Sequence, residues 1–272
     1  WKHVQTRENL ALLIDLGVTV IGPDSGIQAC GDIGSGRMTE PMEVVNTLES
    51  QLARGPLAHR KVVITAGPTY EPIDPVRYLA NRSSGKMGFA LAAAASRLGG
   101  SVTLISGPAH LETPSGVARI DIETAQEMLV AVENSLDDTD IFIGAAAVCD
   151  MRPAKPSTNK LKKSIDNLST IALTENVDVI QAVANDRRRP TLVIGFAAET
   201  DSVLENAKEK LLVKSLDAVI ANCVANGDIF GQDNTRVTLI QNDMENPLTP
   251  GTKAEVAMEI MTFISKFLSK RI

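Results

Sequence analysis

One stretch of the chain, residues 65–88, joins an apolar, β-branched segment to an alanine-rich segment with helical composition. It carries cationic, amide and hydroxyl side chains, namely Arg77, Asn81, Arg82, Ser83, Ser84 and Lys86. The first N–H groups of a helix lack intrahelical partners and therefore favour an anion. The stretch is predicted to bind an anionic substrate; the alternative is a surface loop that only connects a strand to a helix.

Two later stretches place small residues directly after predicted strands. Residues 144–150 end in Asp150, whose carboxylate can accept hydrogen bonds, and residues 195–200 include Phe196, which can stack on a base. Small side chains let a planar group or a sugar approach the backbone. Such strand ends can also simply pack closely against helices. Their recurrence at equivalent positions favours a nucleotide.

Lysines gather at two places beyond these strand ends. The run Lys160-Leu-Lys-Lys163 lies among Pro and Ser, where one ammonium group can stabilise the negative charge of a triphosphate. Lys210 and Lys214 follow Phe196 and are one helical turn apart, so they can face the same phosphates. The alternative for both groups is a solvated surface.

Two common nucleotide-binding motifs are absent. The first strand-to-helix connection lacks G-x-G-x-x-G, and the second strand ends in Ser106, where a ribose-binding acidic residue is expected in dinucleotide-binding proteins. A Walker loop is excluded because Met87 follows Lys86 and no Gly stands five residues before Gly85.

These residues are positioned by an alternation of strands and helices that begins near residue 61. Strands are expected at 62–64, 102–105, 117–122, 141–148, 170–173, 191–197, 218–222 and 237–240, the last at a sheet edge. Helices are expected at 86–98, 124–135, 177–186, 201–215 and 252–270, with Asp201 capping the fourth. The pattern predicts an α/β fold: a doubly wound, mostly parallel, Rossmann-like sheet with helices on both faces and a protruding arm at 150–168.

The first sixty residues have a different organisation. A helix at 5–16, a short strand at 18–21, a mobile glycine-rich flap at 22–38, a helix at 41–52 and a linker at 53–59 are expected. The chain opens on Trp1 rather than Met, which predicts a piece of a longer protein.

Composition narrows the function classes. The chain has 272 residues and a net charge of -6, which argues against broad nucleic-acid binding. Three widely spaced cysteines fit a reducing, cytoplasmic location and give no zinc pattern. No apolar run is long enough for a membrane span. An anionic ligand must therefore meet a local basic cluster.

Six motifs in order, TAGPT, DPVR, NRSSGKMG, AAVCD, KLKK and GFAAET, resemble the ligase half of the bacterial bifunctional coenzyme A biosynthesis proteins. These proteins fuse a phosphopantothenoylcysteine decarboxylase to a phosphopantothenate-cysteine ligase. The resemblance runs from about residue 60 to the C-terminus. Residues 29–38, ACGDIGSGRM, are similar to the substrate flap of the decarboxylase. The implied domains are a decarboxylase remnant with linker at 1–58 and a ligase at 59–272.

The resemblance implies a CTP-dependent ligation of 4'-phosphopantothenate and cysteine through an acyl cytidylate, with Mg2+ accompanying the triphosphate. Asn81 is implied to handle the acyl cytidylate and Lys160 to serve its formation. The implied phosphopantothenate contacts are Arg77, Asn81, Arg82 and Lys86. The implied CTP contacts are Gly144, Ala145, Ala146, Asp150, Lys160, Val177, Asp178, Val179, Ile180, Phe196, Lys210 and Lys214. A homodimer formed through the ligase half is implied as well.

The flap carries a weaker implication. Cys30 corresponds to the acid of the decarboxylase, but the FMN-binding body and the catalytic His of that enzyme are absent, so no decarboxylation is expected of this chain. Metal ligands are not assigned by the sequence. Two rival functions stay open: an NAD(P)-dependent Rossmann oxidoreductase and a non-catalytic nucleotide-binding module.

Overall fold

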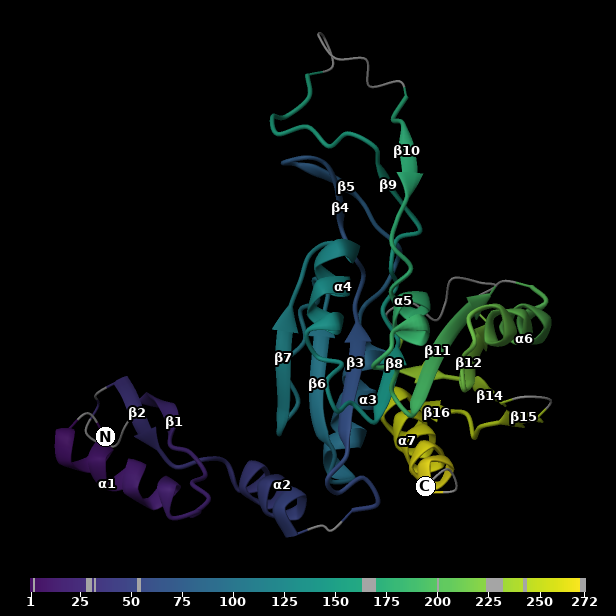
Figure 1. Cartoon of the computed structure of the whole chain (residues 1–272). Coiled ribbons are helices and arrows are strands. Elements are labelled where there is room, and N and C mark those ends of the chain that lie inside the picture. Colours follow the sequence, from purple (N-terminus) through teal and green to yellow (C-terminus); the bar gives the residue numbers. More distant parts are fainter. Residues whose placement is uncertain are drawn as a thin grey trace. The chain divides into compact units, whose positions relative to one another are not determined.

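The computed structural model describes residues 1, 3–27, 31, 33–52, 55–162, 170–199, 201–223, 232–241 and 244–269. The chain divides into two compact units, residues 1–52 and residues 53–272 (Figure 1). Among the described residues, no helix is long and apolar enough to cross a membrane.

The N-terminal unit contains two helices and a hairpin. Helix α1 spans Val4–Asp15, strands β1 (Asp24–Ile27) and β2 (Ile33–Arg37) pair antiparallel, and helix α2 spans Pro41–Leu52. The predicted flap thus contains a hairpin, while Cys30 lies outside the described residues. The strand expected at 18–21 was wrong, because these residues pair with no strand of the described chain.

The larger unit is built on an eight-stranded sheet. Six strands run parallel in the spatial order β7, β6, β3, β8, β11, β12, and β14 and β15 continue the sheet antiparallel. Their bounds are β3 Lys61–Ala66, β6 Ser101–Ser106, β7 Val117–Asp121, β8 Ile141–Gly144, β11 Leu192–Glu199, β12 Ala218–Cys223, β14 Val237–Gln241 and β15 Met244–Pro247. The chain leaves β3 in one direction and returns to β8 on the other side. The expected doubly wound order is confirmed, with a topological switch point between β3 and β8.

Helices cover both faces of this sheet (Figure 1). Helices α3 (Lys86–Arg97) and α7 (Lys253–Ser269) pack on one face, where Leu91 and Ile260 are fully buried. Helices α4 (Ala125–Glu133), α5 (Val179–Asn185) and α6 (Val203–Val213) pack on the other, around Phe142 and Met128. The central strands are apolar on both faces because both are covered.

Helix α4 shows why several boundaries were predictable. The Thr124 side chain accepts from the Glu127 N–H, and the Glu127 carboxylate accepts from the Thr124 N–H. This capping box follows from a Thr with a Glu three residues later, a pattern that marks a helix start in the sequence. The N-cap residue of α6 is Ser202 rather than the expected Asp201; Ser202 has a left-handed conformation and its side chain makes no capping hydrogen bond.

Three strand predictions need correction. Strand β14 is not at the edge, because β15 pairs with its outer side. Strand β8 stops at Gly144 rather than residue 148, since the chain after it turns to bond with the loop that follows β3. The strand expected at 170–173 is β10, Leu173–Glu175, which pairs antiparallel with β9, Met151–Pro153.

Short two-stranded pairs lie outside the main sheet. Within the long connection from β3 to α3, β4 (Glu71–Asp74) pairs with β5 (Arg77–Leu79). These two strands and the β9–β10 pair extend from the same end of the sheet (Figure 1). A further pair, β13 (Asn234–Thr235) with β16 (Gly251–Thr252), leads directly into α7.

Candidate active site at the strand ends

A cavity of about 970 Å³ lies at the carboxyl ends of β3, β8 and β11. This is the edge where open parallel sheets bind ligands, and the cavity includes the switch point between β3 and β8. It is lined by 14 of the residues predicted from sequence: Asn81, Arg82, Lys86, Gly144, Ala145, Ala146, Asp150, Val177, Asp178, Val179, Ile180, Phe196, Lys210 and Lys214.

Backbone hydrogen bonds join the two loops at the switch point. Ala145 N donates to Thr65 O at 3.2 Å and Ala147 N donates to Gly67 O at 2.8 Å. The side-chain amide of Asn81 donates to Val148 O at 2.9 Å, so Asn81 is held against the loop that ends in Asp150. The chain that follows β3 and the loop that follows β8 are therefore joined at the base of the cavity.

The start of α3 faces this cavity. Gly85 precedes the helix in a left-handed conformation (φ 75°) and contributes no side-chain cap. One turn later, Gly88 lies against β3 so closely that an added Cβ would stand 2.5 Å from the Ala66 Cβ. Helix α3 therefore lies directly against β3, and the N–H groups of its first turn, which have no partner within the helix, are brought to the strand end.

The α5–α6 side of the cavity carries two lysines in defined positions. Lys210 Nζ donates to Phe196 O at 2.6 Å, and Lys214 Nζ lies 2.6 Å from the Asp178 carboxylate. Burial lowers the pKa of Lys210, and the charge of Lys214 lowers it further. An anion placed here would relieve the repulsion between the two ammonium groups.

The wall beside these lysines is formed by the start of α5. Asp178 caps the helix by accepting from Gln181 N at 3.0 Å. Ile180 packs over Gly144, where an added Cβ would stand 3.1 Å from its Cδ1 atom. The missing side chain at Gly144 thus lets Ile180 of α5 pack directly against the sheet edge, which is the close packing that the sequence left open as the alternative.

Two predicted residues that the structure describes do not line the cavity, and a third is not described. Cys30 lies outside the described residues. Lys160 is exposed on the arm, and Arg77 belongs to the β4–β5 hairpin. The structure therefore brings together the nucleotide set and most of the phosphopantothenate set, but not Lys160 and Arg77, within one chain.

Arg77 instead pairs with the buried Asp74 carboxylate at 3.1 Å. Asp74 also accepts from the N–H groups of Val76, Arg77 and Leu161. Burial alone would raise the pKa of Asp74, but these donors and the Arg77 charge outweigh it and lower the pKa. Since Leu161 adjoins Lys160, Asp74 fastens the arm to the hairpin.

Sequence reasoning missed other residues of the cavity, notably Lys253, Asn222 and Thr235. Lys253 is only 9% exposed, although a lysine at the start of a terminal amphipathic helix reads as a surface residue. The Asn222 side-chain oxygen is buried without a hydrogen-bond partner in the described chain. Only the tertiary arrangement, in which β12 pairs with β11 and β13 pairs with β16 just before α7, places these residues here.

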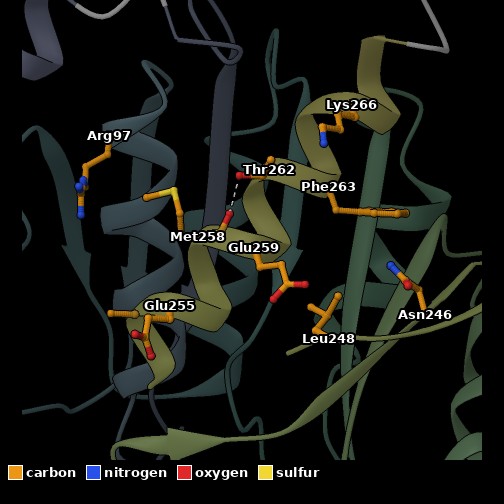
Figure 2. Close-up of a pocket in the computed structure, with 10 residues that line it drawn as sticks. Arg97, Asn246, Leu248, Glu255, Met258, Glu259, Thr262, Phe263 and Lys266 are labelled. Carbon is orange, nitrogen blue, oxygen red and sulfur yellow. Dashed lines mark hydrogen bonds between the residues drawn. The ribbon is translucent and has the colours of Figure 1, made fainter. Parts of the chain in front are cut away.

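A second groove, of about 690 Å³, runs along α7 (Figure 2). Figure 2 shows Met258, Thr262 and Lys266 on α7 and Arg97 on α3 at its border. None of the residues predicted to bind a substrate lies in it. The strand-end cavity is therefore the candidate active site.

The chain is similar to known proteins over most of its length. It is 45% identical over 270 residues to the coenzyme A biosynthesis bifunctional protein CoaBC of Vibrio vulnificus, covering 98% of this chain and 67% of that protein. It is 46% identical over 253 residues to CoaBC of Escherichia coli, covering 91% and 62%. The chain thus spans about two thirds of the length of these relatives.

Solved structures agree with these sequence relatives. The crystal structure of the C-terminal domain of CoaBC matches with a TM-score of 0.68 and 37% identity, covering 79% of this chain and 99% of that domain. A Cab2 variant in complex with phosphopantothenate-cysteine shares the fold with a TM-score of 0.65 at 14% identity, covering 86% of this chain and 95% of that one.

The family model described as "DNA/pantothenate metabolism flavoprotein C-terminal domain" matches residues 57–268, which is nearly all of the larger unit. The short N-terminal unit lies outside that match but inside the match to the bifunctional relatives. The chain belongs to the DFP family, and over nearly its whole length it corresponds to bifunctional CoaBC proteins of coenzyme A biosynthesis.

Proposed function

We propose that this chain catalyses the CTP-dependent ligation of 4'-phosphopantothenate and L-cysteine, through an acyl cytidylate. The observation that supports this most directly is the cavity itself: one strand-end site holds Asn81, the open start of α3 and the lysines of α6. A nucleotide and a second phosphorylated substrate both need cations, and joining them needs a site that holds both at once.

The first step is the attack of the phosphopantothenate carboxylate on the α-phosphorus of CTP. A P–O bond to the acyl group forms, and the bond to pyrophosphate breaks. Lys210 and Lys214 bind and orient the nucleotide. Lys160, which the arm carries to a site formed with a second copy, stabilises the charge that develops on the phosphates. The activation is necessary because a free carboxylate is a poor electrophile.

The second step is the attack of the cysteine amine on the acyl carbon. A C–N bond forms, CMP leaves with the electrons of the C–O bond, and the amine proton passes to solvent or to the leaving phosphate. Asn81, fixed by Val148 O, presents an amide donor beside the acyl group. Such a donor stabilises the oxyanion of the tetrahedral intermediate.

Mg2+ is proposed to enter with the triphosphate. The described residues contain no group of three or more His, Cys, Asp or Glu side chains suited to a metal ion. The cavity offers separate carboxylates such as Asp150 and Glu199. This donor set suits an ion held chiefly by nucleotide phosphates, which is usual for Mg2+. FMN is proposed only for the decarboxylase part of the longer relatives.

A homodimer is proposed as the working form. Lys160 and Arg77 lie away from the cavity of their own chain, and they sit on neighbouring protrusions, the arm and the β4–β5 hairpin. Apolar side chains of these protrusions, including Val76, Tyr78 and Leu173, are exposed. A second copy that covers them would bring Lys160 and Arg77 to a site.

The assignment is tested by incubating the chain with CTP, Mg2+, 4'-phosphopantothenate and cysteine. Pyrophosphate release that needs phosphopantothenate, followed by an amide product that needs cysteine, is expected, with both products identified by mass spectrometry. A parallel binding measurement compares CTP, ATP and NADPH. Preferential NADPH binding would favour the oxidoreductase, and binding of CTP without turnover would favour a non-catalytic module.

A further inference from the structure

Two lysines reach the cavity from the face of the sheet opposite to α6. Lys86 is the first residue of α3 and Lys253 is the first residue of α7, and both line the cavity. Helices α3 and α7 belong to one hydrophobic core and α6 belongs to the other. The cavity therefore has cations on both sides of the sheet edge, and Lys86 and Lys253 form what we call the α3–α7 lysine pair.

The Asp233 carboxylate lies at this pair. Lys86 Nζ is 2.6 Å from Asp233 Oδ1, and the backbone N–H of Lys253 donates to Asp233 O at 2.7 Å. The Lys86 hydrogen bond lowers the pKa of Asp233, and the charge of Lys253 contributes. Asp233 is thus an anion placed beside two cations that line the cavity.

The three side chains differ in how easily they can move. The Asp233 side chain is 83% exposed and that of Lys86 is 34% exposed, whereas Lys253 is 9% exposed. An exposed carboxylate can leave its partner at little cost because water solvates it. A buried ammonium cannot do the same, since it would remain without a counter-charge.

The surroundings of Lys253 hold its ammonium group in place. Lys253 Nζ donates to Gln232 O, and the β13–β16 pair joins Thr235 to Gly251 just before α7. Thr252 and Glu255 cap α7: Glu255 Oε2 accepts from Thr252 N at 2.8 Å. The Lys253 side chain is therefore held in position before any ligand binds.

The two ammonium groups act on each other. Burial lowers the pKa of Lys253, the positive charge of Lys86 lowers it further, and Asp233 opposes this. A phosphate group placed beside both ammonium groups would favour their charged forms.

We propose that Lys253, together with Lys86, binds a phosphate group of an anionic substrate, and that this phosphate replaces Asp233 as the ionic partner of Lys86. The identity of the substrate rests on the proposed ligase function, in which CTP and 4'-phosphopantothenate both carry phosphate. Lys253 is then a substrate-binding residue, and Asp233 is an internal competitor of the substrate.

Two substitutions with opposite expected signs test this. In the full chain, Lys253→Met removes the charge but keeps the length of the side chain, and should weaken binding of one phosphorylated substrate by about tenfold or more. Asp233→Asn removes the competing charge, and should tighten binding of the same substrate severalfold. Dissociation constants for CTP and for 4'-phosphopantothenate are measured separately by titration calorimetry, and the substrate affected identifies the phosphate.

Lys266→Met is the matched control, since Lys266 lies on the same helix but at the second groove, and it should change neither constant. Unchanged dissociation constants for both substrates in Lys253→Met would overturn the proposed role of Lys253. Weaker substrate binding in Asp233→Asn would overturn the proposal that a substrate phosphate displaces Asp233. If Lys253→Met does not fold, Asp233→Asn still decides between tighter and weaker binding. Failure of the ligase proposal is seen separately, as absence of product from the unchanged chain.

Discussion

The cavity and the arm hold their functional residues in different ways. The cavity is built from strand ends whose loops are joined by backbone hydrogen bonds, such as Ala147 N to Gly67 O, so its residues move with the sheet. The arm consists of the β9–β10 pair beyond the sheet, tied to the β4–β5 hairpin through Asp74. The sheet thus fixes the residues that are proposed to bind substrate, while the arm carries Lys160, which is proposed to act at a site formed with a second copy.

Lys160→Gln is expected to have the largest effect. It should abolish pyrophosphate release from CTP plus 4'-phosphopantothenate, because the charge that stabilises the transition state is lost, while CTP still binds in the cavity. Release is measured with a coupled phosphate assay. Lys155→Gln, also exposed on the arm, serves as the control and should retain activity. Normal release by Lys160→Gln would reduce the arm to a structural element.

Asn81→Asp should separate the two chemical steps within the cavity. A carboxylate has no N–H to donate to the oxyanion of the second step, so acyl cytidylate should accumulate and the amide should form about a hundredfold or more slowly. Quenched reactions analysed by mass spectrometry report both species. The control Asn246→Asp lies at the second groove. Amide formation at the normal rate would show that Asn81 does not act on the intermediate.

Gly88→Ala tests how tightly the cavity scaffold is packed. The new Cβ would stand 2.5 Å from the Ala66 Cβ, and neither backbone can yield without disturbing β3. We expect a loss of unfolding free energy of about 1 to 3 kcal/mol, measured by urea denaturation. Ala93→Gly on the same helix calibrates the contribution of helix propensity. Stability equal to or above that of the unchanged chain would contradict the close approach.

The smallest effect is expected from Asp186→Asn, which lies in neither region. The side-chain and backbone donors of Arg188 lower the pKa of Asp186 to about 2, although burial opposes them. A carboxyl with a lowered folded-state pKa stabilises the fold above its unfolded pKa of about 3.9, and this stabilisation is lost as the pH falls toward about 2.

The variant should therefore be slightly less stable at neutral pH, and the difference should shrink as the pH is lowered from about 5 to 3. Denaturation midpoints at these pH values measure it. Asp138→Asn, whose carboxylate is 88% exposed, is the control and should show a smaller difference. A stability difference between the variant and the unchanged chain that grows as the pH falls would contradict the lowered pKa of Asp186.

The sequence predicted those helices and strands whose apolar spacing or capping residues are visible within the element itself. Helix α7 was visible from the apolar spacing of Val256, Ile260 and Ile264, and α4 from its capping box. Strand β15 was missed because its exposed residues lack apolar alternation, and only pairing with β14 makes it a strand. The β4–β5 hairpin was missed because a long polar connection with prolines resembles an irregular loop.

The same distinction applies to the candidate site. Residues that follow strands, such as Asp150 and Phe196, could be predicted to meet because parallel strands end at one edge. Lys253 could not, since its place depends on the antiparallel return through β14 and on the β13–β16 pair. Whether the predicted residues bind CTP and phosphopantothenate stays a prediction that the variants above address.

The Asp74 carboxylate has a consequence for the order of the reaction. It binds Arg77 of the hairpin and Leu161 of the arm at once, and the hairpin leads within a few residues to Asn81. Lys160 and Asn81, proposed for successive steps, are therefore linked through Asp74 within one chain. In the proposed homodimer Lys160 acts at the other site, so a shift of the arm when pyrophosphate departs there would be carried to Asn81 of its own chain. Activation at one site would then be coordinated with amide formation at the other.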